Sequence, residues 1–261
     1  MAAARDQGIT INSDLGEGVG LHRFGNDAAL LELVDVANVA CGFHAGDPAV
    51  MAETVAAAAE HGVRIGAHPG LPDLAGFGRR ELKLTKDEVD QLLTYQVGAL
   101  VGFLTAHGVR LNHLKPHGSL YGMLARDPEL MLAAARVAGR YGVPFYGMVG
   151  TAHETVCAAA DVPFVGELYV DLNYRADGSL IIERKAHPVD PAAAAERVRQ
   201  ALRTGRIDAA DGSSIEVQFS SVCVHSDGPN AVPVAEAVRA VMDSESAVPG
   251  PAVLGPEEGT S

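Results

Sequence analysis

The stretch Asn38-Val39-Ala40-Cys41-Gly42-Phe43-His44-Ala45-Gly46-Asp47-Pro48 is a short apolar run that ends in glycines and in side chains able to carry chemistry. Five other apolar runs of the chain also end in such side chains, usually beside a glycine. They end in Asp14-Leu15-Gly16-Glu17-Gly18, Gly66-Ala67-His68-Pro69-Gly70, Lys115-Pro116-His117-Gly118, Glu167-Leu168-Tyr169-Val170-Asp171 and Val224-His225-Ser226-Asp227. In a parallel α/β barrel the carboxyl ends of all strands lie on one face, so residues distant in sequence meet there. The pattern predicts a single α/β barrel with one polar pocket, which favours an enzyme.

Apolar runs alternate with helical patterns along the chain, as they do in βαβ units that build a parallel sheet. The candidate strands are Ile9–Asn12, Val36–Ala40, Val63–Ala67, Arg110–Leu114, Pro144–Val149, Phe164–Tyr169 and Ile215–Val224. Thr85, followed three residues later by Glu88, predicts a capping box at the start of the clearest helix. Asp47-Pro48, Asp127-Pro128 and Asp190-Pro191 each predict a helix start with proline at the first helical position.

Two stretches interrupt this alternation. Pro69–Arg80 is rich in glycine and proline, and it predicts a long loop over the active face. Asn173–His187 predicts a hairpin insertion that turns at Asp177-Gly178. No domain linker is visible, so residues 1–243 are expected to form one domain. Residues 244–261 have little to bury and are expected to form a disordered tail.

Composition limits the classes of function. The chain has 261 residues with 48% hydrophobic content, enough for one large core, and no apolar stretch of the roughly 18 to 20 residues that a membrane helix needs. A net charge of -13 argues against nucleic-acid binding. The start of the chain lacks the pattern of a secretory signal. The cysteines Cys41, Cys157 and Cys223 form no CxxC pair, which fits a reducing cytoplasm, and Cys41 is more readily a buried thiol than a nucleophile.

The first four candidate catalytic residues are Asp14, Glu17, His44 and His68. Two histidines and a carboxylate from neighbouring strand ends can hold Zn²⁺ with an open position for water. They can equally transfer protons without a metal, because histidine titrates near neutral pH. No close-spaced ligand motif decides between the two, so metal binding stays open. The alternative for Glu17 is that it only orders the turn.

Lys115 and His117 are the remaining catalytic candidates, and they flank a proline at a strand end. A lysine in such a pocket can bind a substrate carboxylate or stabilise an oxyanion. Arg79 and Arg80, at the end of the long loop, can bind an anionic substrate. Alternatively, they are an exposed pair that interacts only with solvent.

Further candidates for substrate binding are Asp47, Glu167, Asp171, His225 and Asp227. Asp47 has an alternative role as a helix cap, and Asp171 and Asp227 have alternative roles in turns. An even spacing puts Glu167 and Asp171 on one face if the strand extends that far.

Several common enzyme motifs are absent. There is no GxxxxGK[ST] loop for ATP, and Ser119 does not lie in a GxSxG elbow. The glycines around Glu17 miss the GxGxxG spacing, and the carboxylates there would oppose a pyrophosphate.

Five segments, in order along the chain, resemble the LamB/YcsF family. They are Asn12–Gly18, Asn38–Pro48, Gly66–Pro69, Pro72–Arg80 and Lys115–Tyr121. The resemblance implies a seven-stranded α/β barrel of the glycoside hydrolase/deacetylase type. It also implies the A subunit of 5-oxoprolinase, which opens 5-oxo-L-proline to L-glutamate with ATP in a complex with subunits B and C.

Two departures from the family pattern are visible. Leu172 stands where the family usually has arginine, and Ser226 stands where it usually has glycine. Loss of the arginine can change recognition of a substrate carboxylate, so amide chemistry is better supported than one particular lactam. Two other functions stay open. One is a non-catalytic binding subunit, and the other is a metal-dependent deacetylase of an N-acetylated small molecule or sugar, with Asp14, His44 and His68 as metal ligands. The sequence is also compatible with a homo-oligomer.

Overall fold

A curled sheet of six parallel strands forms the centre of the molecule, in the order β3-β2-β1-β10-β5-β4. The computed structural model describes residues 8–22, 25–181 and 186–246. The strands are β1 (Thr10–Leu15), β2 (Val36–Ala40), β3 (Arg64–His68), β4 (Phe145–Gly147), β5 (Phe164–Tyr169) and β10 (Ser221–Cys223). They are mostly buried because both faces of a parallel sheet are covered. The predicted parallel α/β architecture is confirmed.

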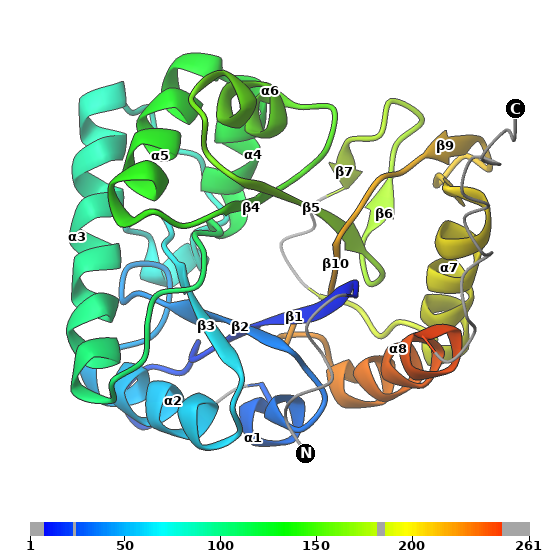
Figure 1. Ribbon diagram of the computed structural model, residues 1–261, viewed down its shortest axis with the longest axis horizontal. Helices are drawn as coiled ribbons and strands as arrows, with labels where there is room; N and C mark the ends of the chain where they lie inside the picture. Colours follow the sequence, from blue (N-terminus) through cyan, green and yellow to red (C-terminus); the bar gives the residue numbers. More distant parts are fainter. Residues whose placement is uncertain (1–7, 23–24, 182–185, 247–261) are drawn as a thin grey trace, which may run out of the picture.

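Helices surround the curled sheet on its outer side (Figure 1). Their bounds are α1 (Asp27–Leu31), α2 (Pro48–Glu60), α3 (Lys86–Ala106), α4 (Gly118–Arg126), α5 (Pro128–Tyr141), α6 (Ala152–Ala159), α7 (Pro191–Thr204) and α8 (Ala231–Ser246). The predicted capping box of Thr85 and Glu88 opens α3. The side chains of Asp47, Asp127 and Asp190 cap the helices that begin at the following prolines. All four predicted helix starts are confirmed.

The predicted strand Arg110–Leu114 is not a regular strand. Instead, residues 112–115 join the two outer strands of the sheet through isolated bridges, from Ala67 of β3 to Leu114 and from Leu114 to Phe145 of β4. The Lys115 N–H donates to the Ala67 carbonyl at 2.9 Å, and the Tyr146 N–H donates to the Leu114 carbonyl at 3.0 Å. This segment links the outer strands and delivers Lys115 to the interior.

The predicted strand Ile215–Val224 is also wrong in its extent. It divides into β9 (Ser214–Glu216), which pairs with β8 (Arg206–Asp208) in an antiparallel hairpin, and the central strand β10. Burial alternates over residues 214–220 and then becomes continuous from Ser221. Alternation is typical of a half-exposed hairpin, and a continuous buried run is typical of a parallel strand, so the two parts belong to different sheets.

The hairpin predicted within Asn173–His187 is confirmed for the part that the structure describes. Strands β6 (Asn173–Tyr174) and β7 (Leu180–Ile181) pair antiparallel, while residues 182–185 lie outside the described residues. The predicted loop Pro69–Arg80 contains only one turn of 3₁₀ helix, at Leu74–Gly76.

Buried apolar side chains from the sheet and the helices form one core cluster, which includes Ile11, Leu93, Val222 and Val238. Helix α8 continues three residues past the predicted domain boundary at residue 243, and residues 247–261 of the predicted tail lie outside the described residues. None of the helices in the described ranges has the length and apolar character needed to cross a bilayer.

A close contact inside the sheet gives a stability test. A Cβ atom at Gly66 of β3 would lie 2.0 Å from Cε1 of the buried His113 ring, which stacks on Tyr146 with 4.1 Å between ring centroids. We expect Gly66→Ala to lower the free energy of unfolding by about 3 kcal/mol, because an overpacked core must move its backbone or rings. Urea denaturation measures the change.

The matched control is Gly102→Ala in α3, where an added Cβ meets nothing within 4 Å. Alanine is the better helix former there, so we expect a gain of about 0.5–1 kcal/mol. A Gly66→Ala protein as stable as the wild type would contradict the packing described for His113.

Candidate active site

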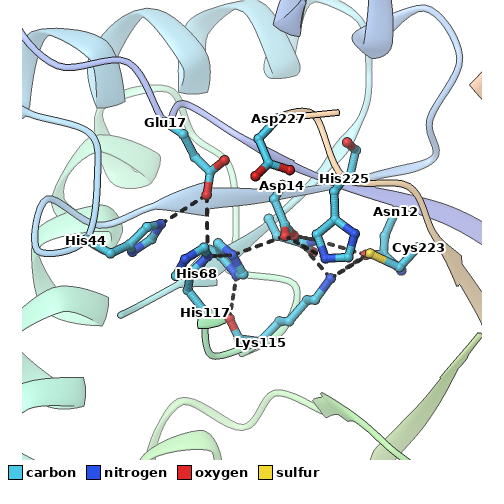
Figure 2. Close-up of polar contacts among 12 residues, drawn as sticks. Asn12, Asp14, Glu17, His44, His68, Lys115, His117, Cys223, His225 and Asp227 are labelled. Carbon is cyan, nitrogen blue, oxygen red and sulfur yellow. Dashed lines mark hydrogen bonds and ion pairs between the residues drawn. The ribbon is translucent and has the colours of Figure 1, made fainter. Parts of the chain in front are cut away.

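The six side chains predicted to be catalytic touch one another in an unbroken series at the carboxyl ends of the strands (Figure 2). In order, the members are His44, Glu17, His117, His68, Asp14 and Lys115. They come from the ends of β1, β2 and β3 and from the segment that links β3 to β4. Parallel strands place these ends on one face, which is why residues a hundred positions apart meet.

The first four members of the series are three imidazoles and one carboxylate. His44 Nε2 lies 3.1 Å from Glu17 Oε1, and that oxygen lies 3.4 Å from His117 Nδ1. His117 Nδ1 is 3.0 Å from His68 Nε2. The His44 and His117 rings are stacked, with 3.8 Å between their centroids and 4° between their planes.

Lys115 ends the series as a buried ammonium group with 2% exposure. Its Nζ lies 3.1 Å from Asp14 Oδ1 and 3.1 Å from Glu167 Oε1, and it donates to Asn12 Oδ1 at 3.1 Å and to Cys223 Sγ at 3.0 Å. Burial alone would lower the pKa of Lys115, but Asp14 and the other neighbours hold it well above its usual range. The amine is therefore a fixed positive charge at the floor of the site.

Asp14 is held in its ionised form. The Asn38 side chain donates to Asp14 Oδ1 at 2.7 Å, from the residue that pairs with Asp14 in the register of β1 and β2. Burial alone would raise the pKa of Asp14, but His68 and Lys115 hold it well below its usual range. Asp14 Oδ2 lies 3.3 Å from His68 Nε2, so an ionised carboxylate faces an imidazole.

Glu17 differs from Asp14 in its electrostatics. It is buried, and neither lysine nor arginine lies within ion-pair distance of it among the described residues. Burial and the nearby Asp14 carboxylate raise the pKa of Glu17 well above its usual range. Two neighbouring carboxylates with opposite pKa shifts are typical of sites that divide acid and base roles.

Two further ion pairs lie on the wall of the pocket. Arg79 Nη2 lies 2.8 Å from Asp227 Oδ2, and His225 Nδ1 lies 2.9 Å from Asp171 Oδ1. Burial alone would lower the pKa of His225, but Asp171 raises it to about 9. His225 is therefore protonated at neutral pH.

A cavity of about 210 Å³ opens over these groups. Its polar lining includes Asp14, His68, Arg79, Lys115, His117, Asp171, His225 and Asp227. Its apolar lining includes Tyr121, Leu172, Leu180, Val189 and Val234. A polar floor beneath an apolar wall is the usual design of a small-molecule site.

Three of the predicted substrate-binding residues do not line this cavity. Asp47 caps α2 and accepts the Gly20 N–H at 2.6 Å. Arg80 pairs with Asp73 on the surface. Glu167 lies behind Lys115 and also accepts the Tyr169 hydroxyl at 2.9 Å. Their contacts are structural, and a role in substrate binding stays a prediction for each.

Sequence reasoning missed a buried polar layer under the site. Asn38 Nδ2 donates to Asn12 Oδ1 at 2.8 Å, and His113 Nε2 lies 2.6 Å from Asn38 Oδ1. Cys223 also belongs to this layer, through Lys115. The sequence carries two signals for this layer. Asn12 lies two residues before Asp14, and side chains two apart in a strand share a face. Asn38 is a polar residue inside an apolar strand.

A sequence model of the LamB/YcsF family matches residues 9–252. The chain belongs to the LamB/YcsF family. The lactam utilization protein lamB of Emericella nidulans is 45% identical over 237 residues, which cover 89% of this chain and 93% of that protein. The A subunit of 5-oxoprolinase from Limosilactobacillus fermentum is 45% identical over 235 residues, which cover 88% and 94%. The crystal structure of the lactam utilization protein of Thermus thermophilus superposes with a TM-score of 0.85 at 39% identity, covering 92% and 97%.

Within the described part of this LamB/YcsF protein, two groups of side chains have donor atoms close enough to share a metal ion. One contains Glu17, His44, His68 and His117, and the other contains Asp14, Cys223 and His225. The set suggested by the sequence, Asp14 with His44 and His68, does not coincide with either group. In the structure Glu17 and His117 accompany the two histidines, while Asp14 Oδ1 is occupied by Lys115 and Asn38.

The pair of His225 and Asp171 predicts how stability depends on pH. The ion pair stabilises the folded protein fully below pH 6.5, where His225 is protonated in the folded and the unfolded state. This stabilisation is lost as the pH rises through about 9. We expect the stability difference between the wild type and His225→Gln to shrink by about 3 kcal/mol over that range. Urea denaturation of both proteins at both ends of the range measures it. An unchanged difference would contradict the assigned ion pair.

Proposed function

We propose that this chain is the lactam-opening subunit of a 5-oxoprolinase, which converts 5-oxo-L-proline to L-glutamate with consumption of ATP. The observation that carries the proposal is the match to relatives named as the A subunit of 5-oxoprolinase over 94% of their length, at 43–45% identity. The site geometry supports it, because Asp14, His68, Lys115 and His117 line one cavity, while Glu17 and His44 lie outside its lining and contact His117. Partner subunits B and C would handle ATP, since the chain has no phosphate-binding loop.

Opening a lactam needs an activated water, stabilisation of the oxyanion and a proton for the departing nitrogen. Asp14 is suited to the role of base because it is ionised and lines the cavity beside His68. His225 is suited to donate a proton or stabilise negative charge, because it is protonated and its Nε2 lies 3.7 Å from Asp14 Oδ2. Lys115 fixes the Asp14 carboxylate in position.

Arg79 on the wall is a candidate partner for the substrate carboxylate, and it already pairs with Asp227. The cavity wall carries Leu172 where the family usually has arginine. An assay that compares 5-oxo-L-proline with 2-pyrrolidinone, the same ring without a carboxylate, measures how much this carboxylate contributes to recognition.

The test of function mixes this chain with subunits B and C, ATP and 5-oxo-L-proline, and measures glutamate and ADP. Omitting each component in turn gives the controls, and the Limosilactobacillus fermentum relative replaces this chain as a positive control. Glutamate formation that needs this chain supports the proposal. Formation with the Limosilactobacillus protein but not with this chain would overturn it.

Asp14→Asn should lower turnover in that assay by roughly 10²-fold or more, because an amide cannot accept the proton. The control is Asp87→Asn at the exposed start of α3, which should leave turnover unchanged. Circular dichroism confirms that both variants fold. An Asp14→Asn protein with the wild-type rate would remove Asp14 from the mechanism.

A metal-dependent deacetylase is a second candidate, favoured by the cluster of Glu17, His44, His68 and His117. Metal-dependent release of acetate from an N-acetylated sugar, without ATP or partners, would support it. We also infer from the sequence a seven-stranded barrel of the glycoside hydrolase/deacetylase type, formed by residues 1–243, and a cytoplasmic location. The segment that links β3 and β4 supports the barrel.

A further inference from the structure

The hydrogen bonds of two buried histidines fix which of their nitrogens carry a proton. His68 Nδ1 lies 2.8 Å from the Lys115 carbonyl oxygen, and His117 Nε2 lies 2.8 Å from the Phe77 carbonyl oxygen. A carbonyl oxygen can only accept a hydrogen bond, so each of these nitrogens must donate. In the neutral rings, His68 Nε2 and His117 Nδ1 are therefore both unprotonated.

These two unprotonated nitrogens face each other at 3.0 Å, with Glu17 Oε1 3.4 Å from His117 Nδ1. Lone pairs directed at one point repel one another unless a positive group lies between them. In known metal sites, the ring nitrogen that does not bind the metal donates to a carbonyl or a carboxylate, which orients the histidine. The Lys115 and Phe77 carbonyls occupy that position here. This cluster has the arrangement of a cation site and not of a hydrogen-bonded core.

We propose that His44, His68, His117 and Glu17 bind one transition-metal ion, with Zn²⁺ as the best fit. Three imidazole nitrogens and one carboxylate oxygen are a ligand set that suits zinc. Tetrahedral zinc with bonds of about 2.0–2.1 Å places its donor atoms about 3.3–3.5 Å apart. The three contacting donor pairs are separated by 3.0, 3.1 and 3.4 Å, and all four donors lie within 4.8 Å of one another.

The loop Pro69–Arg80 is shaped to close over this cluster. A Cβ atom at Gly70 would lie 2.4 Å from His44 Nδ1, and one at Gly78 would lie 2.7 Å from His44 Cβ. The buried Gln96 of α3 holds the loop by accepting the Gly70 N–H at 3.0 Å and donating to the Gly70 carbonyl at 2.9 Å. The glycines let the backbone pack directly on the imidazoles, so the donors are held before any ion binds.

Charge and access also fit a dication. A bound cation would favour the ionised form of Glu17, which then supplies one negative charge, and Asp14, whose Oδ2 lies 3.3 Å from His68 Nε2, supplies a second beside it. His68 and His117 line the cavity, so the ion would lie next to the space that receives a small molecule. Four protein ligands complete a tetrahedral shell, as in structural zinc sites, so a small molecule in the cavity would lie beside the ion.

The test uses the full chain alone, stripped with a chelator and titrated with Zn²⁺ against a chromophoric competitor. We expect one Zn²⁺ per chain by elemental analysis. His117→Asn and Glu17→Gln should weaken the apparent Kd by more than the roughly 10–100-fold typical of losing an outer partner. His61→Asn, at the exposed end of α2, should bind like the wild type and controls for adventitious surface sites.

Cobalt(II) gives a second readout that does not depend on the variants folding. Wild-type protein loaded with Co²⁺ should show the strong visible absorption of a tetrahedral site, and Zn²⁺ should displace it. Failure of the wild type to retain Zn²⁺ would overturn the proposal. The contact between His68 Nε2 and His117 Nδ1 would then be a hydrogen bond with one shared proton. Equal binding by His117→Asn and the wild type would place the ion elsewhere and overturn it too. These measurements need neither ATP nor a lactam, so their outcome is independent of the proposed function.

Discussion

A lysine ammonium buried between two carboxylates holds the centre of this molecule together. Lys115 Nζ reaches Asp14 and Glu167, which belong to β1 and β5, and Asn12 and Cys223 complete its surroundings. An isolated buried charge is costly, so each of these groups depends on the others for its stability. Lys115 lies at the end of the segment that joins the outer strands β3 and β4, whereas its partners lie on the central strands β1, β10 and β5. The ion cluster therefore needs the curled sheet that brings this segment over the central strands.

The positions of the strand ends could be predicted from the sequence, because each combines an apolar run with glycine and a chemically active side chain. Asp14, His44, His68 and Lys115 meet where that pattern places them. The helix starts could also be predicted, because a capping side chain accepts hydrogen bonds from backbone N–H groups only two or three residues away. Local chemistry determined these features, so a single sequence was enough.

Features that depend on distant partners could not be read in the same way. The segment Ile215–Val224 divides because its first part pairs with β8, whereas its last part pairs with β1 and β5. The apolar content of the segment alone does not reveal this difference. The sequence predicts that Arg80 can bind an anionic substrate, but in the structure Arg80 pairs with Asp73. The sequence gives only a spacing signal for Asn12 and Asn38, and the register of β1 against β2 is what places them under Asp14.

Helix α3 touches both of the loops that flank the histidine cluster. Gln96 is bonded to Gly70 on one side, and the ring of its neighbour Tyr95 stacks on Phe43, next to His44, with 5.3 Å between centroids. Tyr95 is also 67% exposed, so the same helix turn faces solvent. Helix α3 therefore holds both loops in position. The exposed ring of Tyr95 thus contacts the loop that carries His44, although it lies outside the cavity lining.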